Sequence, residues 1–227
     1  METRPNNTLP LLLHIATTIT GLIDAISYLG LGHVFTANMT GNVVFLAFAV
    51  AGAPGLSIPR SLTALGAFFV GAVIGGRAAT RLSELVRPNW VTTALSLEAV
   101  LLLVATLAAI NFRDSSGSLF QSYSIIVLTA LAMGIRNATV RKMGIPDFTT
   151  TVLTLTITGL AADSTFAGGT NPRWHRRLLA VLLIFFGAAI GTLLLRHSLV
   201  LALATATLLS ICCVALSMKQ RIVLATN

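Results

Sequence analysis

The chain repeats itself at half its length, and both copies are strongly apolar. Residues 69–75 (Phe-Val-Gly-Ala-Val-Ile-Gly) recur as residues 185–191 (Phe-Phe-Gly-Ala-Ala-Ile-Gly), and scattered matches link residues 21–36 to residues 134–149. The offset is about 113 to 116 residues in a chain of 227. Internal duplication in an apolar chain is typical of membrane transporters and channels, where a solute route lies between the two halves.

The composition places the chain in a lipid bilayer. Hydrophobic residues make up 55% of the sequence and charged residues only 10%, and apolar runs of about twenty residues recur along it. The net charge of +8 does not indicate nucleic acid binding, because the basic residues sit in short gaps between apolar segments rather than on one soluble face. We therefore expect an all-α, polytopic transmembrane helical bundle.

Six segments are long and apolar enough to cross a hydrocarbon core of roughly 30 Å. Two further segments, residues 38–52 and 148–162, are too short or too polar for a clear assignment, and they occupy the same place in each copy. We treat residues 1–227 as a single transmembrane domain, with repeat one at 10–111 and repeat two at 120–218. The six predicted spans are 10–32, 61–83, 91–111, 120–140, 177–195 and 198–218.

The distribution of Lys and Arg favours six full spans and a cytoplasmic amino terminus. This arrangement places twelve of the 15 basic residues inside, whereas eight full spans would place eight inside. A seven-span alternative, in which 38–52 crosses and the amino terminus lies outside, gives eleven against four. It ranks second because it treats corresponding parts of the repeat differently. Three spans per copy is an odd number, so we expect an inverted repeat with one half-inserted helix in each copy.

Polar residues gather just before the two short segments. Non-helical backbone at membrane depth needs protein or water to satisfy it, so these turns are expected to face an internal cavity. Helix starts also expose N–H groups that suit an anion or a polar solute. The alternative is that these residues only cap helices. The predicted substrate-binding residues are Asn38, Thr40, Asn42, Asp147, Thr150 and Thr151.

Asp24 lies in the middle of the first span, where a charge costs roughly 3 kcal/mol or more unless it is paired or hydrated. Its counterpart in the second copy is Asn137, next to Arg136. Asp24 is either a protonatable switch or the partner of Arg136 in a structural ion pair. We assign Asp24, Arg136 and Asn137 to coupling or gating. Glu98, a second intramembrane carboxylate, is expected to make an interhelical hydrogen bond rather than line the route.

Two pairs of glycines have the small-xxx-small spacing that lets helices approach closely. Gly71 with Gly75, and Gly187 with Gly191, predict packing surfaces. We expect them to place their spans against the half-inserted helices or against each other.

The sequence does not favour an enzyme, a metal or a cofactor. The histidines at 14, 175 and 197 have no second ligand at metal-binding spacing, and Cys212 and Cys213 are adjacent residues that cannot easily bridge. A zinc-protease motif, a Gly-x-Ser-x-Gly motif and a phosphate-binding loop with Lys are all missing from the sequence. We expect no catalytic residues, no metal and no ATP hydrolysis.

Five motifs together resemble the YoaK-like family of bacterial integral membrane proteins. They are residues 21–32, 34–42, 141–147, 150–154 and 158–163, of which the Ala-Asn-Met-Thr-Gly-Asn core at 37–42 is the most specific. The resemblance spans nearly the whole chain. Because that family is a domain of unknown function, it implies a bacterial inner-membrane location and gives conditional support for transport, but no substrate and no catalytic residues.

The sequence thus predicts an inner-membrane transporter or channel for a small polar or anionic solute. Its expected partners are the lipid bilayer and that solute, and self-association is left open. The alternative is a non-transporting membrane component, such as an assembly factor or a subunit that needs a partner. That alternative predicts polar residues near 36–42 and 147–158 packed against protein without a cavity.

Overall fold

The computed structural model describes residues 8–83, 87–110, 119–144 and 153–225, and every regular element in these ranges is helical. Six helices are long and apolar enough to cross a membrane, as the hydropathy pattern predicts. With 22 to 27 residues each they are about 33 to 40 Å long. They are α1 (Thr8–Gly30), α3 (Ile58–Ser83), α4 (Arg87–Ala109), α5 (Leu119–Met143), α7 (Trp174–Leu195) and α8 (Leu199–Ala225).

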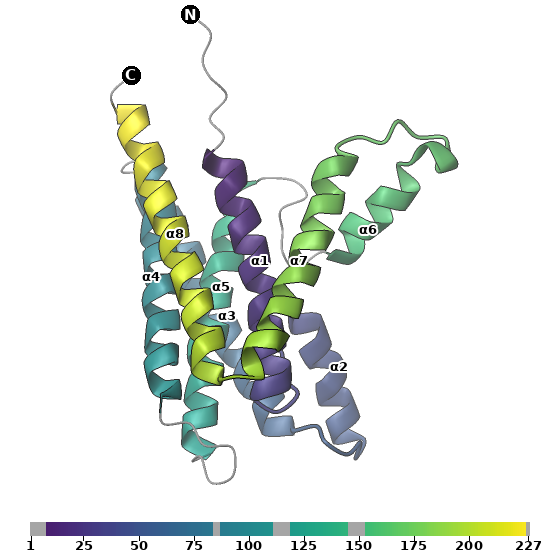
Figure 1. The fold of residues 1–227 in the computed structure, drawn as a ribbon, viewed down its shortest axis with the longest axis vertical. Helices are drawn as coiled ribbons and strands as arrows, with labels where there is room; N and C mark the ends of the chain where they lie inside the picture. Colours follow the sequence, from purple (N-terminus) through teal and green to yellow (C-terminus); the bar gives the residue numbers. More distant parts are fainter. Residues whose placement is uncertain (1–7, 84–86, 111–118, 145–152, 226–227) are drawn as a thin grey trace, which may run out of the picture.

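The two doubtful segments form short helices. α2 (Met39–Val50) has 12 residues and α6 (Leu153–Ala162) has 10, followed by the 3-10 turn η1 (Thr165–Ala167). Helices of this length reach only about 15 to 18 Å, roughly half of a hydrocarbon core. α2 lies toward the end of the bundle where α1 ends, and α6 toward the opposite end (Figure 1). A full crossing by 38–52, which the seven-span alternative requires, does not fit a helix of this length.

The spanning helices of each half pack mainly against those of the other half, so the two halves exchange helix partners. α1 packs along α7, and in the same way α5 packs along α3. The contact of α4 with α5 is matched by that of α8 with α1, and the contact of α2 with α3 by that of α6 with α7. The last spans, α4 and α8, pack against each other. Following the chain through Figure 1, the corresponding helices α1 and α5, α3 and α7, and α4 and α8 run in opposite directions.

Glycines bring α3 and α5 into backbone contact. A Cβ atom at Gly134 of α5 would collide with the carbonyl oxygen of Phe68, and one at Gly71 of α3 would collide with that of Leu131. Close approach of this kind lets two helices gain van der Waals contact inside a bilayer. The glycine pair of α3 is therefore a packing surface, and its partner is α5. α3 does pack against the short helix α2, as expected, but the expectation that the two glycine-bearing spans α3 and α7 meet each other is wrong.

The same contact is built again between α1 and α7. A Cβ at Gly21 would collide with the carbonyl oxygen of Ile184, and one at Gly187 with that of Thr18. Gly21 corresponds to Gly134 in the repeat, so both interfaces use matching positions. The duplicated motifs are thus explained by one helix-pair contact that occurs twice.

Candidate functional site

A buried ion pair joins four spanning helices. Arg136 of α5 and Glu98 of α4 are only 2% and 1% exposed. Arg136 donates to both carboxylate oxygens of Glu98, with Nε to Oε2 at 2.8 Å, and its Nη1 donates to the Ala16 carbonyl of α1 at 3.0 Å. Ser210 of α8 donates to Glu98 Oε1 at 2.8 Å. A bidentate pair with these additional hydrogen bonds satisfies both charges inside the protein.

This pairing corrects one prediction and confirms another. The proposed pair between Asp24 and Arg136 is wrong, because in the described part of the chain Arg136 binds Glu98 instead. The interhelical hydrogen bond expected for Glu98 is confirmed. Asn137, next to Arg136, donates to the Met133 carbonyl of its own helix at 2.9 Å.

Two further polar contacts lie along the same seam between α4 and α8. The hydroxyls of Thr92 and Ser217 are 2.6 Å apart, and those of Thr106 and Thr207 are 2.9 Å apart. Together with the Glu98–Ser210 hydrogen bond, they make three polar contacts between the antiparallel helices α4 and α8. Interhelical hydrogen bonds of this kind fix helix register in a bilayer.

Asp24 anchors the turn that leads into α2. Its Oδ1 accepts the backbone N–H of Ala37 at 3.3 Å, and the carboxyl group also faces the backbone N–H of Asn38. Ser27, almost one turn further along α1, accepts the N–H of Thr36 at 3.2 Å. A carboxylate at a helix N-terminus interacts favourably with the helix dipole. The turn over 31–38 is therefore folded back against α1, with its end held at Asp24.

Asn42 and Asn38 complete this turn rather than face open space. The Asn42 side chain is fully buried; its Oδ1 accepts the N–H of Phe35 at 2.9 Å and its Nδ2 donates to the Phe35 carbonyl. Asn38 is the N-cap of α2 and accepts the N–H of Gly41 at 3.5 Å. Asn38 and Thr40 are exposed. The capping alternative thus describes Asn38, while Asn42 holds the backbone of Phe35.

An aromatic cluster covers the turn. The rings of Phe35, Tyr28 of α1 and Phe45 of α2 contact one another, with centroid distances of 5.1 Å for Tyr28–Phe35, 5.5 Å for Phe35–Phe45 and 5.8 Å for Tyr28–Phe45. A Cβ at Gly41 would collide with the Phe35 ring. The Ala-Asn-Met-Thr-Gly-Asn motif is therefore explained locally: Gly41 admits the ring of Phe35, and Asn42 binds its backbone.

The second copy is described only in part. Asp147, Thr150 and Thr151 lie outside the described residues, so their predicted place in a central site is not tested. In α6, Thr156 is buried whereas Thr154 and Thr158 are exposed. Within the described ranges, α2 and α6 make no contact with each other.

Arg177 ties α6 to α7, a contact that the sequence analysis missed. Its Nη1 donates to the Gly159 carbonyl at 2.7 Å and to Asp163 Oδ2 at 2.6 Å. The signal available in the sequence was the opposite charge of Asp163 and Arg177, 14 residues apart across a short connection.

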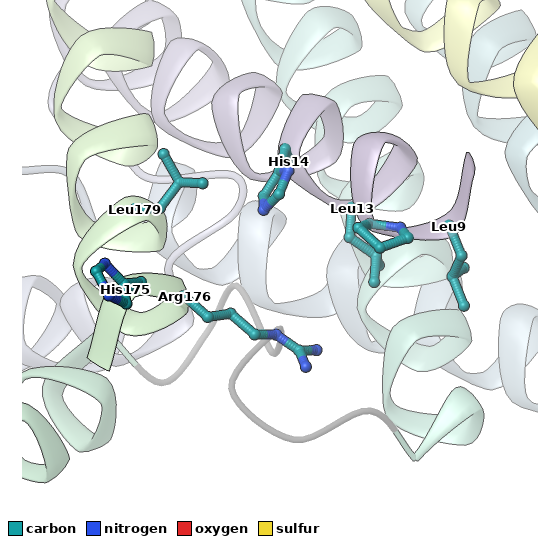
Figure 2. A pocket seen from close by; sticks show the side chains of 7 residues that line it. Leu9, Leu13, His14, His175, Arg176 and Leu179 are labelled. Atoms are coloured by element: carbon teal, nitrogen blue, oxygen red, sulfur yellow. The ribbon is translucent and has the colours of Figure 1, made fainter. Parts of the chain in front are cut away.

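The described residues line two pockets. One of about 470 Å³ opens between the N-terminal ends of α1 and α7 (Figure 2), and one of about 620 Å³ lies beside α6, η1 and α7. Of the residues that the structure describes, Asn38, Thr40 and Asn42 line neither pocket. The described ranges also contain no group of three or more His, Cys, Asp or Glu side chains placed to hold a metal ion.

Comparisons with known proteins agree with the resemblance found in the motifs. The UPF0700 transmembrane protein YoaK of Bacillus subtilis (strain 168) is 38% identical over 152 residues. The match covers 67% of this chain and 65% of that protein, just under two thirds of its length. No solved structure matches the chain. A family model described as a protein of unknown function (DUF1275) matches residues 12–216, so the chain belongs to the DUF1275 family and, with its six apolar spans, is an integral membrane protein.

Proposed function

We propose that the chain is a transporter or channel for a small polar or anionic solute, built as an inverted repeat with a half-inserted helix in each copy. The observation behind the proposal is the turn at the start of α2, folded back against a spanning helix and anchored by Asp24. Asp24 lies six residues before the end of α1, about 9 Å into the bundle. Half-inserted helices in membrane proteins of this kind present their N-termini to a solute.

The exchange of helix partners supports the inverted arrangement. Each contact of one copy has a counterpart in the other, and corresponding spans run in opposite directions (Figure 1). Three spans per copy require this if both halves cross the same bilayer. In such a repeat, α6 would enter from the face opposite to α2, and Asp147, Thr150 and Thr151 would take the place that residues 34–38 have in the first copy.

Asp24 is the proposed coupling residue. Two backbone N–H groups that an anionic solute could use just before α2, those of Ala37 and Asn38, are already bound by the Asp24 carboxyl group. An anion can take this position only when Asp24 is protonated or displaced, which would couple anion entry to a proton. Arg136 does not share this role in our proposal, because Glu98 and the Ala16 carbonyl engage its guanidinium group.

A flux screen in proteoliposomes tests the proposal. We expect Asp24→Asn and Asn38→Ala to change the uptake of at least one small anion or polar solute. Thr205→Ala is the control, because Thr205 of α8 lies far along the chain from the turn and its hydroxyl donates to the Leu201 carbonyl of its own helix. Folded Asp24→Asn and Asn38→Ala proteins with every measurable flux unchanged would overturn the site assignment.

One observation favours the second candidate, a non-transporting membrane component. Both polar ends of the buried Asn42 side chain are bound to Phe35, which is the closed packing that this candidate predicts. A transporter explains the same packing as an occluded state. If the purified chain alone moves no solute, and solute moves only when a partner protein is reconstituted with it, the chain is a subunit that needs a partner and the second candidate is correct.

We also propose that the amino terminus faces the cytoplasm of a bacterium. The proposal follows from the excess of Lys and Arg at the end of the bundle where α1 begins. In a variant without the native cysteines, a thiol at Ala53→Cys is expected to react with an impermeant reagent from outside, and one at Thr165→Cys only after the membrane is opened. Labelling in the reverse order contradicts this orientation.

A further inference from the structure

The space between the N-terminal ends of α1 and α7 follows from how the two helices cross. They touch where Gly21 and Gly187 bring their backbones together. From this point their N-terminal ends diverge toward the end of the bundle that holds both chain termini (Figure 1). The divergence leaves the pocket of about 470 Å³ described above, which we call the α1–α7 wedge.

The wedge combines an apolar wall with cationic and imidazole groups. Figure 2 shows the side chains of Leu13 and His14 on α1 facing those of His175, Arg176 and Leu179 on α7. Leu9 and Pro10 complete the α1 side. An apolar slot beside a guanidinium group matches an amphiphile that has a hydrocarbon tail and a negatively charged head.

Trp174 indicates the depth of these groups in the bilayer. It is 42% exposed, and its ring stacks on His175 with a centroid distance of 3.6 Å. Tryptophan is enriched at the level of the lipid headgroups. This ring therefore indicates headgroup depth for the neighbouring His175 and Arg176, with Leu179 one turn deeper along α7.

The wedge is at the strongly basic end of the molecule. Among the described residues, the only basic side chains at the opposite end are Arg60 and Arg196. Asp163 is the single acidic residue of the described ranges near the basic end. A basic surface attracts anionic lipids, and a Lys or Arg that reaches the bound headgroup contributes about 1 kcal/mol. The described basic residues at this end are Arg77, Arg81, Arg87, Arg141, Lys142, Arg173, Arg176, Arg177, Lys219 and Arg221.

From these observations we propose that the α1–α7 wedge binds an anionic phospholipid, with the phosphate at Arg176 and His175 and an acyl chain along Leu13 and Leu179. Free phosphate cannot use the apolar wall. A zwitterionic lipid can use it but brings no net negative charge to the basic end. Of the described residues, the wedge contains none that we assign to the solute route, and the lipid proposal does not depend on that route.

Native mass spectrometry of the full chain in detergent tests the proposal. Phosphatidylglycerol and phosphatidylcholine with the same acyl chains are titrated, and the bound fraction is measured. We expect the protein to retain phosphatidylglycerol about fivefold more strongly, the effect of one basic side chain at this depth. Equal retention of the two lipids, or displacement of phosphatidylglycerol by inorganic phosphate at the same concentration, overturns the proposal.

Two variants locate the site. Arg176→Gln is expected to lower phosphatidylglycerol retention about fivefold, whereas Arg141→Gln, an exposed basic residue of the same end outside the wedge, leaves it unchanged. Leu179→Trp fills the apolar slot without changing charge and is expected to lower the bound fraction of both lipids. Equal effects of Arg176→Gln and Arg141→Gln on phosphatidylglycerol retention contradict the site. If Arg176→Gln does not fold, the Leu179→Trp variant decides instead, and unchanged retention of both lipids by that variant contradicts the site.

Discussion

Replacing Glu98 by Gln isolates the buried ion pair, because the change removes the negative charge and keeps the shape. Arg136 remains 2% exposed, with the Ala16 carbonyl and one amide oxygen in place of a carboxylate. A basic side chain left without its counter-charge at membrane depth costs about 3 kcal/mol. We therefore expect Glu98→Gln to lower the free energy of unfolding by about 3 kcal/mol, an equilibrium change of about 150-fold.

Ser210 gives a matched control. Ser210→Ala removes one hydrogen bond to Glu98 but leaves both charges paired, so it should cost about 1.5 kcal/mol, the lower end for a hydrogen bond to a charged group. Replacing both charged residues, as in Glu98→Met with Arg136→Met, leaves no charge at this contact and should recover most of the loss caused by Glu98→Gln.

Equilibrium unfolding in mixed micelles with increasing SDS measures all three variants in one assay. The reasoning is refuted if Glu98→Gln costs no more than Ser210→Ala. It is equally refuted if the double variant is less stable than Glu98→Gln, because the charges would then contribute more together than an apolar pair of similar volume.

Two further predictions concern packing. Asn42→Ala leaves the backbone N–H and C=O of Phe35 without their partner and should lower the free energy of unfolding by about 1 to 3 kcal/mol. Thr40→Ala, at an exposed position, should change it very little in the same unfolding assay. Equal losses in the two variants would contradict the role of Asn42 in holding the turn. Gly134→Ala places a methyl group against the backbone of α3 and should cost about 1 to 3 kcal/mol, whereas Gly76→Ala has open space and should be neutral or stabilising; a destabilised Gly76→Ala with a stable Gly134→Ala would show that the helix contact is misplaced.

Hydropathy and length were sufficient to predict the spans. The six predicted segments match the six apolar helices within a few residues at most ends, and both doubtful segments are half-length helices. These features follow from bilayer thickness and helix rise, which act on each segment separately. The glycine spacing likewise predicted packing surfaces.

The choice of partners could not be predicted in the same way. A sequence gives the depth of Asp24, Glu98 and Arg136 in the membrane but not the direction in which each helix face points. Two carboxylates therefore lie at accessible depth for Arg136, and depth alone does not distinguish the Asp24 alternative from the Glu98 pair that the structure shows. The glycines of α3 and α7 identified a close contact without identifying the helix on the other side.

The motif before α2 shows a different limit. Asn38 and Asn42 were assigned to a solute because polar side chains at depth are expensive, yet an irregular turn also needs hydrogen-bond partners. The Phe35 backbone is such a partner, and only the folded turn places it beside Asn42. Asp147, Thr150 and Thr151 lie outside the described residues and stay predictions.

The exchange of partners between the halves has a consequence during synthesis. Gly21 of α1 meets Ile184, about 160 residues later in the chain. At roughly 5 to 20 residues per second, the ribosome needs on the order of ten seconds or more to produce that partner. During this interval α1 stands in the lipid with its glycine face uncovered, so the nascent first half depends on the insertion machinery, or on neighbouring lipid, until the second half arrives.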